Sequence, residues 1–278
     1  MKKFLKVLLS GVLAVCTLTC FTACNGNDEA IYVDTNAFFA PFEYYDGTEI
    51  KGVDIDIMNK VGEKLGKTVV FENTDFDVII DNVSSGNRYD CGAAGITITD
   101  ARKEKVDFSN PYYTSIQYVI YKATDTSLPV QTATDGTSCI YWSSLMNKNI
   151  GVQRDTTGNI YADIEMNGDG PDYPGELAGT TGTLTPYDNA QLAVDAIGAN
   201  QIDVVIVDEL PAQFICNNNS NYVCKALYYD ADTATEEEYA ICVTKGTTEL
   251  LEAINAVLAE LGEQGINALV KKHLGLEG

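Results

Sequence analysis

The chain has 278 residues, of which 45% are hydrophobic, and its 40 acidic against 18 basic side chains give a net charge of −22 at pH 7. Nucleic acid is a poor partner for so acidic a surface, because a phosphate backbone binds basic patches. The length and apolar content suit one large domain or two modest ones with real cores.

The N-terminus has the pattern of a bacterial lipoprotein signal. Three lysines in the first six residues precede an apolar run that ends in small residues before Cys24. We therefore expect a signal peptide over residues 1–23, a lipidated Cys24 and a tether over residues 24–29. Cys20 is a poorer rival, and an uncleaved membrane anchor would place the protein on the same side of the same membrane. No later segment approaches the roughly 18 to 20 continuous apolar residues of a spanning helix, so we expect the rest to be soluble.

Apolar runs of strand length alternate with helical patterns along the rest of the chain, which indicates an α/β architecture. Helical spacing predicts helices that begin near residues 53, 76, 190 and 250, followed by a terminal helix around 268–273. Gly66 is the expected stop of the first helix. Strands are expected near residues 69–71, 116–121, 149–153, 202–207 and 239–243.

Residues 94–113 carry the most specific local signal. A short strand of small residues runs into a glycine turn at Gly95, and Thr97 and Thr99 follow. Thr99 is a credible helix N-cap, which places Arg102 in the first turn of that helix. Exposed amides, hydroxyls and a bidentate guanidinium would then converge on a small carboxylate.

This stretch resembles the signature of the extracellular solute-binding proteins of amino-acid ABC transporters. In that family a Gly-x-Thr-x-Thr-x-x-Arg run precedes a Val-Asp-Phe-Ser-x-Pro-Tyr segment, and both occur here from Gly95 to Tyr112. The resemblance implies an α/β, two-lobed fold of the type II periplasmic-binding-protein kind, each lobe a mixed β-sheet flanked by helices. It places lobe 1 at residues 30–118 plus 240–278 and lobe 2 at 119–239, joined by a two-segment hinge.

The resemblance also assigns residues to a ligand site between the lobes. Phe39 and Phe76 fall on its two aromatic walls, although each could simply be core packing. Thr157, in an anion-binding turn over residues 151–158, falls where a hydroxyl meets the ligand carboxylate. Asp208 resembles the aspartate that holds the α-ammonium, with an N-cap for the following helix as the alternative.

A charge scheme follows from these assignments. Arg102, Thr97 and Thr157 would take the carboxylate of an α-amino acid and Asp208 its ammonium, so both ends are matched only when the lobes close. Two positions depart from the family, which usually has glycine at Asp155 and aspartate at Asn36. The acid at Asp155 could favour a ligand with a cationic side chain or could simply face solvent. The absence of an acid at Asn36 favours a ligand with a neutral side chain.

Other motifs are weaker. Residues 62–68 fall one residue short of a phosphate-binding loop and fit a helix C-cap better. The acidic stretch 165–176 approaches calcium-loop spacing, but a solvated loop is the better interpretation.

Cys216 and Cys224 could close a small disulfide loop or remain free, whereas Cys91 and Cys242 are expected as buried thiols. We expect no metal and no cofactor.

Two other functions compete with transport. An exported dehydratase-like enzyme on the same fold could use Asp155 or Glu43, whereas the sole histidine, His273, is expected on a surface helix. A ligand-sensing module would need a partner protein. The sequence favours a lipid-anchored, non-enzymatic and monomeric receptor of an ABC importer, with an amino acid and a membrane permease as partners.

Overall fold

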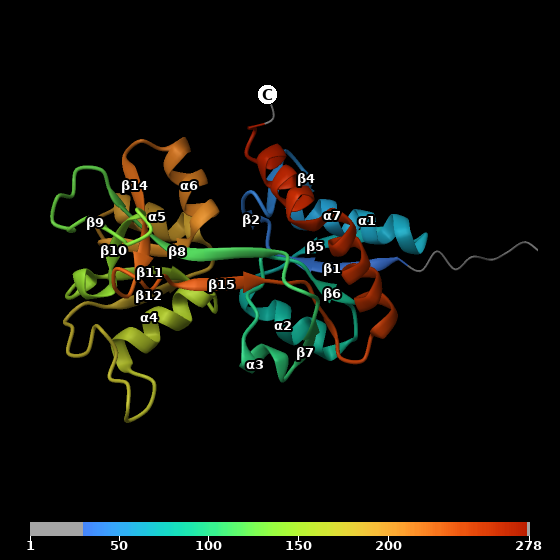
Figure 1. Ribbon diagram of the computed structural model, residues 1–278, viewed down its shortest axis with the longest axis horizontal. Coiled ribbons are helices and arrows are strands. Elements are labelled where there is room, and N and C mark those ends of the chain that lie inside the picture. Colours follow the sequence, from blue (N-terminus) through green and yellow to red (C-terminus); the bar gives the residue numbers. More distant parts are fainter. Residues whose placement is uncertain (1–29, 277–278) are drawn as a thin grey trace, which may run out of the picture.

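The computed structural model describes residues 30–276. Two lobes lie side by side, and β8 (Tyr113–Lys122) and β15 (Glu236–Tyr239) run between them (Figure 1). The two-lobed α/β fold expected from the sequence is confirmed. The expected signal peptide, tether and lipidation site at Cys24 fall outside the described residues. Within residues 30–276 no helix combines the length and the apolar character that a membrane crossing requires.

The first lobe is built on a five-stranded sheet in the order β5-β1-β6-β16-β7. β1 pairs in parallel with β5 and β6, whereas β16 pairs antiparallel with β6 and β7. The strands of this sheet are β1 (Ile31–Thr35), β5 (Val69–Asn73), β6 (Cys91–Gly92), β7 (Val106–Phe108) and β16 (Cys242–Thr244). A separate three-stranded sheet consists of β2 (Phe38–Phe39), β3 (Glu43–Asp46) and β4 (Glu49–Lys51).

Helices pack on the first sheet as their apolar spacing predicts. The helices of this lobe are α1 (Val53–Leu65), α2 (Phe76–Ser85), α3 (Asp100–Lys103) and α7 (Thr248–His273). α1 packs against α7, and α2 packs against β1 and β16. Gly66 ends α1 in the left-handed conformation, so residues 62–68 form a helix end as expected. The expected terminal helix continues α7 beyond a kink at Gly262, where φ is 56°.

The second lobe is built on an eight-stranded mixed sheet. Its order is β12-β11-β13-β8-β14-β10-β9, and β15 pairs with β8 beside this path. The remaining strands are β9 (Gln131–Thr132), β10 (Ser138–Tyr141), β11 (Ile150–Gln153), β12 (Leu184–Tyr187), β13 (Val204–Asp208) and β14 (Tyr222–Tyr228). The helices are η1 (Trp142–Leu145), α4 (Thr157–Asn167), α5 (Ala190–Gly198) and α6 (Glu209–Asn218).

β8 belongs to both halves of the molecule. Its first residues, 113–116, pair with β15, and its later ones pair with β13 and β14 in the second lobe. The extended segment expected at 116–121 is therefore confirmed as part of a longer strand. The single strand expected at 239–243 is wrong, because β15 ends at Tyr239 and β16 begins only at Cys242. The break lets one segment turn from the inter-lobe strand into the first sheet.

Several side chains differ from their expected settings. His273 ends the C-terminal helix α7 beside the exposed Lys271 and Lys272, but its ring turns inward, with its Nε2 2.9 Å from Asp56 and its Nδ1 3.0 Å from the Tyr44 hydroxyl. Glu165, in the last turn of α4, points inward and accepts hydrogen bonds from the loop that follows the helix, at 2.7 Å from the Tyr173 hydroxyl and 2.8 Å from the Glu176 amide. It is therefore not a solvated acid.

The cysteines of the described residues are all free thiols. Cys91 and Cys242 are buried in β6 and β16, as the sequence indicates. Cys216 on α6 and Cys224 on β14 contact each other as thiols.

Candidate functional site

A small hollow between the lobes, which we call the cleft, collects most of the residues that the sequence singles out. Its volume is about 10 Å³, roughly the least that can hold one water molecule. Its lining comes from Asn36, Phe39, Phe76, Ala94, Gly95, Thr97, Gln153, Thr156, Thr157 and Asp208. Arg102 and Asp155 line an adjoining hollow of about 230 Å³, which shares Phe76 with the cleft.

Arg102 is held between the two lobes. Thr99 caps α3 by accepting a hydrogen bond from the Arg102 amide, as its sequence position predicts. The guanidinium donates 2.8 Å hydrogen bonds to the Thr97 carbonyl and, across the cleft, to the Asp155 carbonyl. It also lies 5.5 Å from the centre of the Phe76 ring, within cation–π range. Within residues 30–276, this buried cation therefore has no carboxylate among its hydrogen-bond partners.

The turn at Gly95 requires glycine. Its φ is 55°, and a Cβ there would lie 2.6 Å from the Phe39 ring. Behind the turn, the Gly95 amide donates to the Asp54 carboxylate at 2.9 Å, and the Tyr112 hydroxyl donates to the same carboxylate at 2.5 Å. Burial raises the pKa of Asp54 to about 6. A buried acid thus holds the loop that carries Thr97.

The second lobe contributes the start of α4. Thr156 caps this helix by accepting from the Asn159 amide, and the Thr157 hydroxyl donates to the Thr97 hydroxyl of the other lobe at 2.7 Å. Asp155 has a φ of 56°, a conformation that glycine adopts more readily. Its side chain is exposed, so of the two alternatives raised by the sequence the solvent-facing one holds.

Asp208 lies at the end of β13 with its side chain turned into the protein. It occupies the N-cap position of α6, but its side chain makes no capping hydrogen bond, so the capping alternative is wrong. Instead the carboxylate accepts a 2.7 Å bond from the Gln117 side-chain amide and a bond from the Tyr239 hydroxyl. Burial raises the pKa of Asp208.

Three polar side chains around the cleft were missed from the sequence, namely Gln117, Gln153 and Glu237. Glu237 is buried in β15 and accepts hydrogen bonds from Thr97 at 2.6 Å and from Gln117 at 2.5 Å. Burial, and then the negative charge of Asp208, raise its pKa well above the ordinary value. Strand alternation was the available signal, because Glu237 and Tyr239 share a face while Glu236 faces solvent.

The lobes are closed on each other. Besides the contacts of Arg102 and Thr157, the Gln153 side chain donates to Asn36 across the cleft at 3.0 Å. At the rim, Arg154 lies 3.5 Å from Asp77 of the first lobe. Because so little space remains between these groups, an amino acid can enter only if the lobes separate, and β8 and β15 are the strands that would bend.

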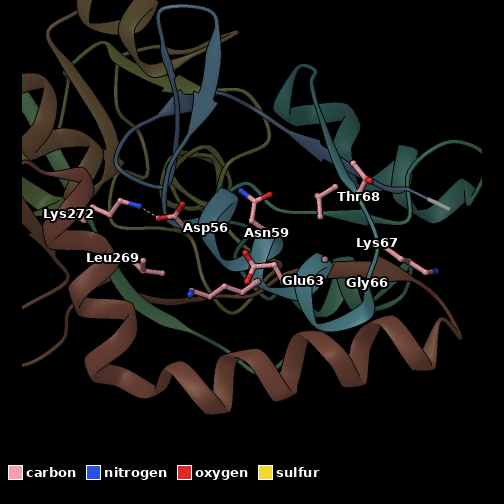
Figure 2. A pocket seen from close by; sticks show the side chains of 11 residues that line it. Asp56, Asn59, Glu63, Gly66, Lys67, Thr68, Leu269 and Lys272 are labelled. Atoms are coloured by element: carbon pink, nitrogen blue, oxygen red, sulfur yellow. Dashed lines mark hydrogen bonds and ion pairs between the residues drawn. The ribbon is translucent and has the colours of Figure 1, made fainter. Parts of the chain in front are cut away.

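A larger hollow of about 710 Å³ lies on the outside of the first lobe, and we call it the outer hollow. α1, the turn that follows it and α7 form this surface, where Lys272 pairs with Asp56 at 2.6 Å (Figure 2). Its lining belongs to one lobe and includes exposed lysines such as Lys60. It shares no residue with the cleft.

Comparison with known proteins decides the family. Residues 31–276 match the bacterial extracellular solute-binding proteins, family 3. The chain belongs to this family.

Relatives and solved structures agree over nearly the whole length. The chain is 26% identical to a probable histidine-binding protein of Neisseria gonorrhoeae, with 100% of this chain and 97% of that protein covered. It is 25% identical to the arginine-binding extracellular protein ArtP of Bacillus subtilis, covering 98% and 97%. The Streptococcus pneumoniae protein AbpA, solved with L-arginine, superposes with a TM-score of 0.73 at 25% identity, covering 89% of this chain and 95% of that one. The chain is therefore an extracytoplasmic amino-acid-binding protein of the ABC-transporter type.

Proposed function

We propose that this protein is the lipid-anchored receptor of an ABC importer, which binds a free α-amino acid in the cleft and delivers it to a membrane permease. Cys24 is the proposed lipidation site, and the receptor acts as a monomer without enzymatic activity. The proposed lobes are residues 30–118 with 240–278, and 119–239. The relatives are named for histidine and arginine, so their names leave the particular amino acid open.

One observation carries the proposal: a carboxylate that lines the cleft and a guanidinium that lines the adjoining hollow come from different lobes. Arg102 comes from α3, and Asp208 comes from the end of β13. An α-amino acid presents a carboxylate and an ammonium a few Å apart. Arg102, Thr97 and Thr157 would take the carboxylate, while Asp208 takes the ammonium. Hydrogen bonds to charged groups contribute about 1.5 to 3 kcal/mol each, enough together for micromolar affinity.

Lobe closure links binding to delivery. The cross-cleft hydrogen bonds join groups that the ligand would otherwise contact, so the amino acid replaces them and is buried when the lobes close. The closed shape is then the form that the permease recognises.

A thermal-shift screen of the purified protein against the common amino acids tests the proposal. A ligand at 100 times its dissociation constant should add about 2.7 kcal/mol of stability. Asp208→Ala should remove the shift, whereas Asp172→Ala, which removes an exposed acid of the same lobe, should keep it. A screen without a single stabilising amino acid contradicts the proposal, and turnover of a bound compound favours the dehydratase-like alternative instead.

A further inference from the structure

Two neutral amides face each other across the cleft. Asn36 follows β1 in the first lobe, and Gln153 ends β11 in the second. Each is 2% exposed, and the Gln153 side-chain nitrogen donates to the Asn36 side-chain oxygen at 3.0 Å. Both line the cleft, so both lie within reach of whatever the lobes enclose.

The orientation of this amide pair is fixed from behind. The Asn36 nitrogen donates to the Thr74 carbonyl at 2.7 Å, which turns the Asn36 oxygen toward the second lobe. The Gln153 oxygen is buried and has no hydrogen-bond partner within residues 30–276. An unpaired buried acceptor is unfavourable. The Gln153 oxygen is therefore free to accept a hydrogen bond from a ligand that binds between the lobes. The Gln153 nitrogen can exchange its hydrogen bond to Asn36 for one to the same ligand.

The charges around the pair disfavour a second cation. Asp208 is the one carboxylate in the lining described for the cleft, and the proposed function assigns it to the α-ammonium. Asp34 on β1 does not line the cleft, and its carboxylate accepts hydrogen bonds from Thr74 at 2.6 Å and from Asn82 at 2.7 Å. At the rim, Asp77 faces Arg154 at 3.5 Å. A positively charged side chain would thus meet neutral oxygens and a neighbouring arginine.

We infer that the ligand is an α-amino acid whose side chain is uncharged and donates a hydrogen bond, of the carboxamide or ureido class, and that Asn36 and Gln153 bind this side chain. The inference rests on the proposed function. A carboxamide or ureido N–H matches the free Gln153 oxygen, and its carbonyl matches the Gln153 nitrogen. A guanidinium or ammonium in the same place would be buried without a counter-charge, which is far more costly.

Two matched pairs of ligands test the side-chain class by isothermal titration calorimetry. Citrulline and arginine have similar length and shape but differ in charge, and citrulline should bind at least about tenfold more tightly. Glutamine should exceed leucine by a similar factor, because leucine leaves the Gln153 oxygen unpaired. Arginine binding as tightly as citrulline overturns the inference, and so does leucine binding as tightly as glutamine.

Variants of Gln153 test the assignment of the residue. Gln153→Glu keeps the shape and adds a carboxylate to the lining, so the preference for citrulline over arginine should fall by about tenfold or more. Gln201→Glu adds the same charge at an exposed turn of the same lobe and should leave the preference unchanged. Gln153→Ala should weaken the binding of glutamine more than the binding of leucine. If these variants bind with the ligand preferences of the unmodified protein, the assignment is wrong.

The failure of the inference is distinguishable from the failure of the proposed function. Amino acids that bind with the opposite preference overturn only the inference. An absence of binding by any amino acid overturns the proposed function, together with the inference that depends on it.

Discussion

The cleft and the outer hollow differ in what lines them. The outer hollow is the larger, about 710 Å³ against about 10 Å³, but it belongs to one lobe and is lined by exposed charges. The cleft collects buried polar groups from segments far apart in the chain, and these groups bond to one another across two lobes. Burying polar groups is costly unless they are paired. Volume and burial thus point to different places, and burial is the better guide to a binding site.

The strongest test of this comparison removes one cation beside the cleft and, separately, one cation from the outer hollow. Arg102→Ala should weaken amino-acid binding by about a hundredfold or more, because charged hydrogen bonds to the ligand carboxylate are lost. Lys272→Ala removes a cation from the outer hollow and should leave the dissociation constant unchanged. Calorimetric titration of both variants measures the difference. Equal losses of affinity would show that the two hollows are not functionally distinct.

The buried Glu43 allows a test of whether an acidic side chain behind the cleft is protonated in the folded protein. Both of its carboxyl oxygens are buried, and the carboxyl group of Asp54 lies beside them. Burial, followed by the negative charges of Asp54 and Asp208, raises its pKa well above the ordinary 4.5. The folded state therefore holds a proton that the unfolded state releases above that pH. The free energy of unfolding should fall as pH rises, by roughly 1 kcal/mol per pH unit while the proton stays bound.

Glu43→Gln cannot titrate and should lose this pH dependence. The variant should match the unmodified protein near pH 4 and become progressively more stable than it toward pH 8, in denaturant unfolding at each pH. Glu63→Gln, at an exposed position of the outer hollow, is the control and should change the profile little. A constant difference between Glu43→Gln and the unmodified protein at every pH would exclude a bound proton.

Glu237 is a positioning residue in this scheme, since it contacts Thr97 and Gln117 and does not line the cleft itself. In Glu237→Gln an amide nitrogen faces one of these two donors, so one hydrogen bond is lost and affinity should fall by about tenfold. Glu236→Gln, one residue away on the exposed face of β15, should bind normally. A structural role alone would change both stability and affinity. Stability of the variant without added ligand is therefore measured beside the titration, and unchanged affinity contradicts the assignment.

Local chemistry explains what the sequence predicted. α1 ends at Gly66 and α3 begins at the Thr99 cap, because capping requires specific residues at specific positions. The glycine turn and Arg102 form one continuous motif, so their neighbourhood was readable without the fold. The resemblance added Asn36, Thr157 and Asp208, which the structure brings to the same cleft.

Contacts between distant segments explain what the sequence did not predict. Gln117, Gln153 and Glu237 are ordinary polar residues on β8, β11 and β15, and only the arrangement of these three strands around the cleft brings them to the site. The inward contacts of the His273 ring were missed for the same reason, since its partners Asp56 and Tyr44 are more than 200 residues away. The free thiols of Cys216 and Cys224 lie on different elements, α6 and β14, whose packing the sequence does not reveal.

The smallest expected effect concerns the rim of the cleft. Arg154 of the second lobe approaches Asp77 of the first at 3.5 Å, but its side chain is 44% exposed. An exposed ion pair contributes at most about 1 kcal/mol and is screened by salt. Arg154→Ala should therefore weaken binding by less than about fivefold at low salt, and the difference should vanish near 1 M salt. Lys64→Ala breaks an ion pair with Glu260 within the first lobe, away from both the cleft and the adjoining hollow, and should not change affinity at any salt concentration. A salt-independent loss in Arg154→Ala would mean that Arg154 contacts the ligand directly, and the cleft would then extend to its rim.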